Sequence, residues 1–221
     1  MRKTILQVIA LLLVPGCIAG FAQAPKAGVY ISDEDIKAVL QRALATKRTN
    51  PDNAIRVIDM GDYQLSVSVI HRGPLVATST VNAPVGATGN TAPMTPAAKP
   101  AAGCGEKRAD AMGPNGILHD FTAESYVILS GHATLITGGV IVNGSRSAPD
   151  DEITTTLNGA SCRGTMVGYA TQAVKPGDVI IIPEGVPHGF SAIPEEVTYL
   201  SIRPDLKKVL RHGYVNPALE K

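Results

Sequence analysis

The chain has 221 residues, of which 44% are hydrophobic and 18% are charged, and its formal net charge at pH 7 is +1. A chain of this length and apolar content can bury one sizeable core, so we expect one folded domain. The charge is balanced, and no dense block of Lys and Arg follows the N-terminal residues. The composition therefore excludes the electrostatic footprint of a nucleic-acid-binding protein and does not indicate an acidic partner.

Residues 1–24 have the pattern of a signal peptide. Arg2 and Lys3 precede an apolar run over residues 5–14, and small residues that signal peptidase accepts end at Ala24. The apolar run is too short to span a bilayer comfortably, so we expect no transmembrane segment after processing. The pattern predicts export to the periplasm or the extracellular space. The alternative is a lipoprotein anchored through Cys17, because the residues before it resemble a lipid-attachment signal.

Two cysteines, Cys104 and Cys162, remain in the chain after residue 24. In an oxidising compartment an even pair of cysteines indicates a disulfide. Such a bridge would close a loop of more than fifty residues and would stabilise the fold by about 3 to 4 kcal/mol in the chain-entropy account. The alternative is two unrelated free thiols, because neither flanking sequence requires the two residues to be close.

Residues 25–53 are expected to form an N-terminal arm followed by an amphipathic helix. Ser32 can cap the helix, acidic residues follow it in the first turn, and Pro51 comes after the helix has ended near residues 46–50. We expect the apolar face of this helix to pack on the domain. That face consists of residues at helical spacing, namely Ile36, Val39, Leu40, Ala43 and Leu44.

Residues 54–75 are expected to hold the first strands of the domain. Two segments rich in β-branched residues, 54–60 and 63–71, flank a Gly-Asp turn and predict a hairpin. In the second strand, Leu65, Val67, Val69 and His71 share one face by the two-residue period. His71 is therefore a candidate for an additional metal ligand, and the alternative is a hydrogen-bonded histidine in the core or at its rim.

Residues 76–115 change in composition to Ala, Pro, Gly and Thr. Such a segment has little apolar surface to offset the entropy cost of ordering it. We expect a flexible insertion within one domain, because the segments on both sides have the pattern of strands of one sheet system. A lid over a pocket is the functional interpretation, and a disordered loop is the alternative.

Residues 116–204 are expected to form the all-β core, and residues 205–221 a C-terminal tail that begins with a short helix over 205–210. Many short strands separated by turn residues predict a sandwich or a barrel. The expected strands are 117–121, 125–129, 133–137, 140–142, 165–170, 179–182 and 197–202.

Three side chains in this core can bind a metal: His119, Glu124 and His188. His119 lies on one expected strand, Glu124 begins the next, and His188 follows a rigid Pro-Glu-Gly-Val-Pro turn. If these strands surround one interior, two imidazoles and one carboxylate converge there. This is a common ligand set for first-row transition metals, and it leaves other positions open for water or substrate.

The spacing of these residues resembles the cupin superfamily. The second cupin motif runs glycine, five residues, Pro-x-Gly, two residues, histidine, three residues, asparagine. Gly177, Pro183, Gly185 and His188 match it. The first motif runs glycine, five residues, His-x-His, three or four residues, glutamate, six residues, glycine. Its second histidine, its acid and its final glycine match His119, Glu124 and Gly131.

The resemblance implies an all-β, cupin-type jelly-roll β-barrel with a metal inside, preceded by the N-terminal helix and interrupted by the low-complexity insertion. Two positions depart from the motifs: Ile117 stands where the first histidine would be, and Ala192 where the asparagine would be. The implied metal is held by three protein ligands, unless His71 supplies a fourth. Iron, manganese, zinc, nickel and copper all suit this set, and a degenerate cupin that binds no metal tightly is the alternative.

The resemblance further implies an exported metal-dependent protein that acts on an unidentified small molecule by oxygenase, isomerase or related chemistry. A non-catalytic cupin that binds a small ligand, with or without metal, is the alternative, and a homodimer is compatible with either. Strand phase makes three aromatic residues candidate pocket liners or core residues: Tyr126, Phe190 and Tyr199. Three arginines could receive an anionic substrate by bidentate contact, although a solvated surface position is the default interpretation and nothing in their spacing overrules it: Arg146, Arg163 and Arg203.

Overall fold

A computed structural model of the protein describes residues 25–76 and 103–220. The predicted signal peptide, Cys17 and residues 77–102 of the predicted insertion lie outside these residues, so the predictions made for them stay predictions. None of the helices in the described residues has the length and apolar character needed to cross a membrane.

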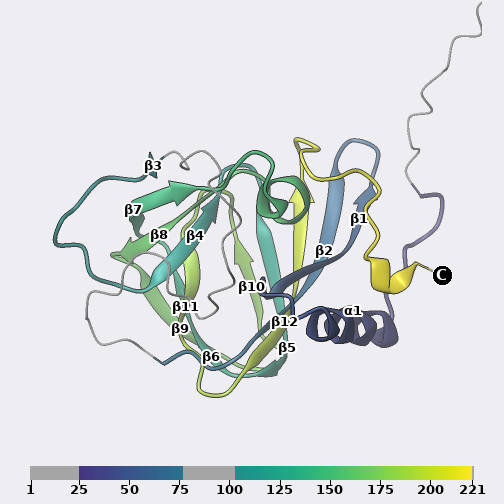
Figure 1. Ribbon diagram of the computed structural model, residues 1–221, viewed down its shortest axis with the longest axis horizontal. Coiled ribbons are helices and arrows are strands. Elements are labelled where there is room, and N and C mark those ends of the chain that lie inside the picture. The colour runs from purple at the N-terminus through teal and green to yellow at the C-terminus, as the bar shows by residue number, and fades with distance from the viewer. Residues whose placement is uncertain (1–24, 77–102, 221) are drawn as a thin grey trace, which may run out of the picture.

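The described residues form two antiparallel β-sheets that face each other (Figure 1). The five-stranded sheet has the order β1 (Asp52–Asp59), β2 (Gln64–Arg72), β12 (Val197–Asp205), β5 (Glu124–Gly131) and β10 (Val179–Ile182). The seven-stranded sheet has the order β3 (Gly103–Cys104), β7 (Val140–Arg146), β8 (Ser161–Val167), β4 (Asn115–His119), β11 (His188–Ala192), β6 (Ala133–Thr137) and β9 (Ala170–Val174).

Successive strands of the core alternate between the two sheets, as a jelly roll requires. The chain passes from β4 to β5 and back to β6, and later from β9 to β10, β11 and β12, changing sheet at each step. The strand pairings stay within each sheet, so the described residues do not close into one continuous hydrogen-bonded barrel. The predicted fold class, a jelly roll preceded by a helix, is confirmed.

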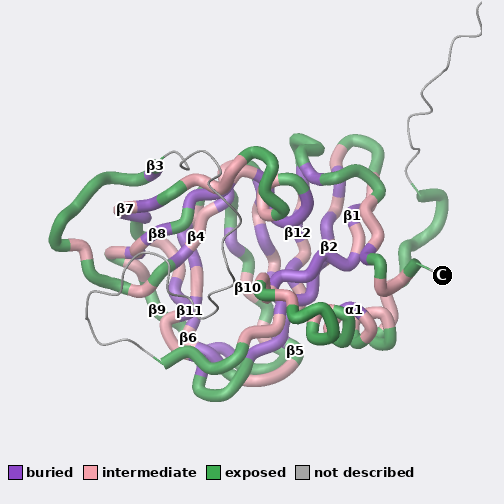
Figure 2. The backbone as a smooth tube through the Cα atoms, in the orientation of Figure 1, coloured by how far each residue is buried: buried purple, intermediate pink, exposed green. Residues whose placement is uncertain are grey.

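The main core fills the space between the sheets, where the buried strand faces meet (Figure 2). The five-stranded sheet contributes residues such as Ile70, Ile128 and Tyr199, and the seven-stranded sheet contributes Leu135 and Phe190. This arrangement follows from the two-residue period of β-strands, which directs alternate side chains to the interior. Polar and charged groups of the same strand faces lie beside this core and form the site described below.

Helix α1 (Asp33–Ala45) covers the outer face of the five-stranded sheet. The predicted capping box is present: the Ser32 hydroxyl accepts a hydrogen bond from the Asp35 backbone, and the Asp35 carboxylate accepts one from the Ser32 backbone. Val39 is the buried anchor of the helix and packs with residues of β1 and β2. The predicted apolar face is wrong at Leu44, which is 75% exposed because it lies beyond the area that the helix buries.

The inward face of β2 carries two buried serines, Ser66 and Ser68, followed by Ile70 of the main core. The opposite face carries Val67 and Val69, which pack under α1. The predicted shared face of Leu65, Val67, Val69 and His71 therefore exists, but it faces the helix side and not the interior.

A disulfide between Cys104 of β3 and Cys162 of β8 crosses the intervening strand β7, with the two Cα atoms 6.1 Å apart. Gly144 of β7 lies directly beneath the bridge, and a Cβ there would lie 2.9 Å from both sulfur atoms. The predicted pairing is confirmed. The predicted flexible insertion ends too late, because residues 103–115 begin with β3, which pairs with β7. This segment is ordered because Cys104 belongs to a buried cluster on the outer face of the sheet.

Three further elements differ from expectation. The predicted helix over residues 205–210 does not form: β12 extends to Asp205, whose carboxylate accepts hydrogen bonds from the backbones of Val209 and Leu210. A short 3₁₀-helix, η2 (Pro217–Leu219), lies near the C-terminus instead. A five-residue π-helix, η1 (Ile153–Leu157), was not expected, and it precedes a residue of the site.

Candidate metal centre

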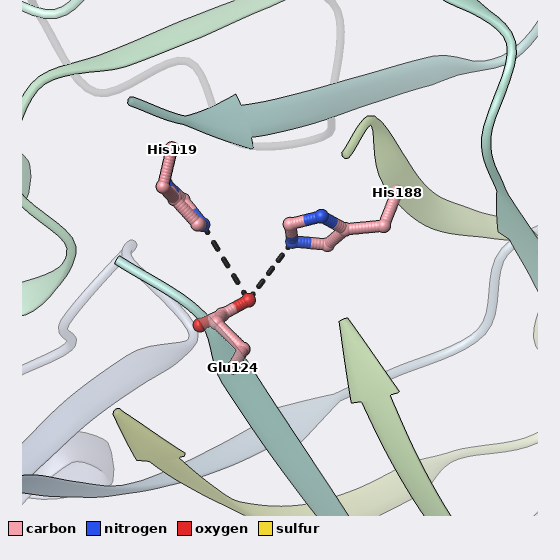
Figure 3. Close-up of side chains that lie close together, drawn as sticks. All are labelled: His119, Glu124 and His188. Carbon is pink, nitrogen blue, oxygen red and sulfur yellow. Dashed lines mark ion pairs between the residues drawn. The ribbon is translucent and has the colours of Figure 1, made fainter. Parts of the chain in front are cut away.

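His119, Glu124 and His188 converge between the sheets, each from the end of a strand (Figure 3). His119 ends β4, Glu124 begins β5, and His188 begins β11. One ligand atom from each residue lies within 4.8 Å of the other two, and all three residues are buried. The structure thus brings together the three residues that the sequence selected.

Gly116 allows β11 to approach β4 closely enough to place His188. A Cβ on Gly116 would lie 2.9 Å from the His188 carbonyl oxygen and 2.0 Å from the Met166 sulfur. Any larger side chain would therefore push these neighbours away from β4. Because His188 is paired with Ile117 across these strands, such a shift would move an imidazole of the site.

Hydrogen bonding fixes the tautomer of His119. Its Nδ1 lies 2.8 Å from the Ser161 hydroxyl, and that hydroxyl donates its own proton to the Gly159 carbonyl at 2.9 Å. Ser161 can therefore only accept from His119, so Nδ1 carries the proton and Nε2 presents a lone pair to the site. Burial lowers the pKa of His119, although the nearby Glu124 carboxylate opposes this effect. The ring is neutral at neutral pH.

His188 has the same tautomer for a simpler reason. Its Nδ1 lies 2.9 Å from the Val186 carbonyl oxygen, which can only accept a hydrogen bond, so Nδ1 is the protonated nitrogen. Its Nε2 is buried and lies 2.9 Å from Glu124 Oε2. In the neutral ring these are two buried acceptors in contact, and either a shared proton or a cation between them would satisfy both.

Glu124 is ionised and held by several donors. Its Oε1 accepts from Arg203 Nε at 2.5 Å, from the Ser201 hydroxyl at 3.0 Å and from Asn158 Nδ2 at 3.1 Å. Its Oε2 accepts from the Tyr126 hydroxyl at 2.7 Å and faces both histidines. Burial alone would raise the pKa of Glu124, but Arg203 and His119 hold it well below its usual range.

Arg203 is a buried cation beneath the site. Its Nη2 lies 2.6 Å from Asp52 Oδ2, and its Nη1 donates to the Ser68 hydroxyl at 2.9 Å. Burial opposes its charge, but Asp52 and Glu124 raise the pKa of Arg203. Sequence reasoning did not place Arg203 beneath the site. The two-residue period of β12 could have indicated it, because Arg203 shares a strand face with the buried Tyr199.

Asn158 is a further site residue that the sequence did not indicate. Its Nδ2 lies 3.1 Å from His119 Nε2 as well as from Glu124 Oε1. It directly follows the π-helix η1, an element often found at functional sites. The Nε2 lone pair of His119 cannot serve both this amide and a metal, so metal binding requires Asn158 to give up this contact.

The remaining candidates have other surroundings. Tyr126, Phe190 and Tyr199 are all buried in the main core, and Tyr126 also reaches the site through its hydroxyl group. His71 lies away from the site: its Nδ1 is 2.9 Å from the Thr198 hydroxyl, and its Nε2 is 3.8 Å from Glu196. The prediction that His71 could be a ligand is therefore wrong, because its side of β2 faces away from the interior.

The three arginines also differ. Arg146 pairs with Asp120, and Arg203 pairs with Asp52 and Glu124, so neither guanidinium is available to an anionic substrate. Arg163 is solvent-exposed and lines a cavity on the interior side of β4 and β8.

The donor set fits a divalent transition metal. It consists of two imidazole Nε2 atoms and one ionised carboxylate oxygen, which together suit iron, manganese, zinc, nickel or copper. The Nδ1 atom of each imidazole donates to a fixed acceptor, Ser161 for His119 and the Val186 carbonyl for His188, as is typical of metal-bound histidines. Ile117 supplies no ligand, so three protein ligands leave positions open.

No protein-family model matches the chain, and no curated protein matches its sequence. Among solved structures, the protein BH2720 from Bacillus halodurans has 11% identity and a TM-score of 0.38, over 88% of this chain and 93% of that one. The DMSP lyase DddQ from Ruegeria pomeroyi has 13% identity and a TM-score of 0.30, over 73% of this chain and 47% of that one. A cupin 2 conserved barrel domain protein from Salinispora arenicola has 13% identity and a TM-score of 0.26, over 70% of this chain and 76% of that one.

These similarities are too weak to carry functional information, and the assignment of the fold rests on the chain itself. Strands that alternate between two facing sheets, with His119, Glu124 and His188 meeting between them, define a jelly roll with a candidate metal site. This is the architecture that the resemblance of the two sequence motifs to the cupin superfamily implies.

Proposed function

We propose that this protein is an exported cupin that binds a divalent transition metal through His119, Glu124 and His188 and acts on a small molecule. The observation that carries the proposal is the convergence of three buried ligand atoms within 4.8 Å of one another, with His188 Nε2 only 2.9 Å from Glu124 Oε2. With neutral imidazoles these are buried acceptors in contact, which costs free energy, and a bound metal would remove that cost.

A metal held by these residues would supply Lewis-acid or redox chemistry at its open positions. The chain prepares the site for it in three ways. Ser161 and the Val186 carbonyl keep the imidazole lone pairs directed inward. Arg203 keeps Glu124 ionised, and the buried rings around Tyr126 exclude water from one side. Burial and Glu124 raise the pKa of Tyr126 well above its ordinary value, so its hydroxyl stays protonated as a donor.

Metal analysis of protein purified under metal-replete conditions tests the proposal. We expect close to one equivalent in the unmodified protein and a strong loss in a Glu124→Ala, His188→Ala double variant. His71→Ala is the matched control, because it removes a histidine that lies away from the three ligands. Equal metal content in the unmodified protein and the double variant would refute metal binding at this site.

A second candidate function, a non-catalytic cupin that holds a small ligand without metal, is favoured by the contacts of Asn158 and Arg203. The Asn158 amide satisfies the lone pair of His119, and the Arg203 guanidinium neutralises Glu124. Turnover of any compound in a panel of phenols, keto acids and sugars by the metal-loaded protein, but not by the metal-free protein, would exclude this alternative.

Export is part of the proposal, because the pattern of residues 1–24 and the Cys104–Cys162 bridge both suit an oxidising compartment. The intact mass of the protein recovered from the producing cell tests it. Processing after Ala24 gives a shorter, unmodified chain, whereas a lipid on Cys17 gives an anchored chain with added mass. A chain that keeps residues 1–24 would contradict export.

A further inference from the structure

In the described residues, the cavity near the proposed metal site contains an arginine that forms no ion pair. This cavity has a volume of about 240 Å³, and residues of β4 and β8 form one wall of it. Ser161, which holds His119, and Ile117, which pairs with His188, both line the cavity. The cavity is therefore lined by direct neighbours of two proposed ligands, His119 and His188.

Strand register places Arg163 in the same row as the site. Ile117 of β4 pairs with His188 of β11 on one side and with Arg163 of β8 on the other. Directly paired residues of antiparallel strands project from the same face of a sheet. Arg163 therefore projects from the face that bears His188, two strand spacings or roughly 10 Å away at the backbone.

Ile117 lies between these two residues. It stands where the first motif would place a histidine, so this side of the site has an apolar side chain instead of a ligand. A molecule that occupies an open metal position on this side would meet Ile117 first and Arg163 beyond it.

Arg163 differs in its pairing from the other arginine of this cavity. Arg146 has a bidentate contact with Asp120 at 2.5 and 2.6 Å, which neutralises its charge. In the part of the chain that the structure describes, no carboxylate forms an ion pair with Arg163. Asp151 also lines the cavity, but its carboxylate accepts from the Ile153 backbone at 2.7 Å.

A second guanidinium strengthens the positive potential. Arg72 contacts neutral groups: its Nε donates to the Tyr199 hydroxyl at 3.1 Å, and its guanidinium lies 6.0 Å from the centroid of the Phe190 ring. Desolvation by the surrounding protein, followed by the charge of Arg72, lowers the pKa of Arg163, and the charge of Asp151 only partly opposes this. An anion in the cavity would relieve this like-charge repulsion.

We propose that the cavity binds the carboxylate of an organic acid whose other end coordinates the metal, with Arg163 as the residue that recognises the carboxylate. This inference rests on the proposed function and specifies its substrate class as a small acid with two anionic groups. The planar guanidinium matches a carboxylate by two parallel hydrogen bonds, and Ile117 contacts the short carbon chain between the two ends.

The test compares malate with 2-hydroxybutyrate on Co²⁺-loaded protein. The two acids share a metal-binding 2-hydroxycarboxylate and differ by a distal carboxylate in place of a methyl group. Binding is followed by the visible absorption of Co²⁺. We expect malate to bind at least about tenfold more tightly, because a charge-assisted contact to Arg163 accompanies it. Arg163→Gln should abolish the preference without changing Co²⁺ uptake, and Arg163→Lys should retain part of it.

Arg211→Gln is the matched control for net charge, because the Arg211 guanidinium packs on the Tyr214 ring and does not line the cavity. It should leave the preference intact. Equal affinity for the two acids, or a preference that survives Arg163→Gln, would overturn the inference while metal binding stands.

If the protein takes up no Co²⁺, the proposed function fails, and carboxylate binding by Arg163 is tested without metal. Calorimetry of the metal-free protein then compares the binding of succinate with that of butyrate. Succinate binding that is lost in Arg163→Gln supports the site, and equal heats for the two acids refute it.

Discussion

Replacing Arg203 by methionine should destabilise the metal-free protein strongly and make it depend on metal. Methionine preserves much of the length and the apolar stem of arginine but removes the charge that lies between Glu124 and Asp52. The variant would also lose the hydrogen bonds to Ser68 and to the Leu157 carbonyl. Two carboxylates would then remain in a buried region without their counter-ion.

The expected loss is large relative to ordinary stability. The Arg203 and Glu124 side chains are each 2% exposed, and that of Asp52 is 12% exposed, so solvent screens the pairs little. Removing one partner of a buried ion pair costs about 3 to 5 kcal/mol. Since a typical domain unfolds at a cost of about 5 to 15 kcal/mol, the metal-free variant would be marginal.

Metal should recover part of this loss. At a metal concentration of one hundred times Kd, binding stabilises the folded state by about 2.7 kcal/mol. Without Arg203, Glu124 offers its full negative charge to the metal, and tenfold tighter binding would add about 1.4 kcal/mol at the same concentration. Urea unfolding with and without Zn²⁺, with the disulfide intact, measures both quantities.

Two results would refute this reasoning. One is a metal-free Arg203→Met protein within about 1 kcal/mol of the unmodified protein, since that is the scale of an exposed ion pair. The other is an equal stabilisation by Zn²⁺ in both proteins. If Arg203→Met does not fold, Arg203→Lys is measured in its place. Arg203→Lys keeps the positive charge and should therefore lose less stability.

Three further predictions concern the ligands, the disulfide and pH. Ser161→Ala should weaken metal binding about 10- to 100-fold, measured by competition with a chelator, because it removes the group that orients His119. Reducing the Cys104–Cys162 bridge should lower the free energy of unfolding by about 3 to 4 kcal/mol in urea titrations. The metal-free protein should lose stability as the pH falls below 6.5, and further below 4.5, because the folded state holds the pKa values of His119 and Glu124 below these ordinary values. The unfolded chain then binds protons that the folded one does not, at about 1.4 kcal/mol per proton and pH unit.

Each of these predictions has a matched control. Ser191→Ala removes a hydroxyl that contacts the Thr134 carbonyl and should leave metal affinity unchanged. A Cys104→Ser, Cys162→Ser variant should be insensitive to reductant. For pH, His119→Gln should remove the decline that begins at 6.5. A decline of the same size in that variant would assign it to another group.

Local signals predicted the elements that depend on neighbours in sequence. The Ser32 and Asp35 capping box begins α1, because capping needs only residues three apart. The turn at Gly61 joins β1 and β2, and the spacing of Gly177, Pro183 and Gly185 before His188 predicted the ligand of β11. The same local reasoning assigned a helix to residues 205–210, where the Asp205 carboxylate bonds to the following backbone without one.

The sequence by itself therefore determined the fold class, the three proposed ligands and the disulfide pair. Only the tertiary structure decided which face of each strand meets the interior, since that depends on register with partner strands distant in sequence. Because of this register, His71 lies on the strand face away from the site and contacts Thr198. The same register brings Arg203 into contact with both Glu124 and Asp52. Within the described residues it also gave Arg163 no ion pair, because the neighbours of a charged residue in the chain do not specify which counter-ion the fold brings to it.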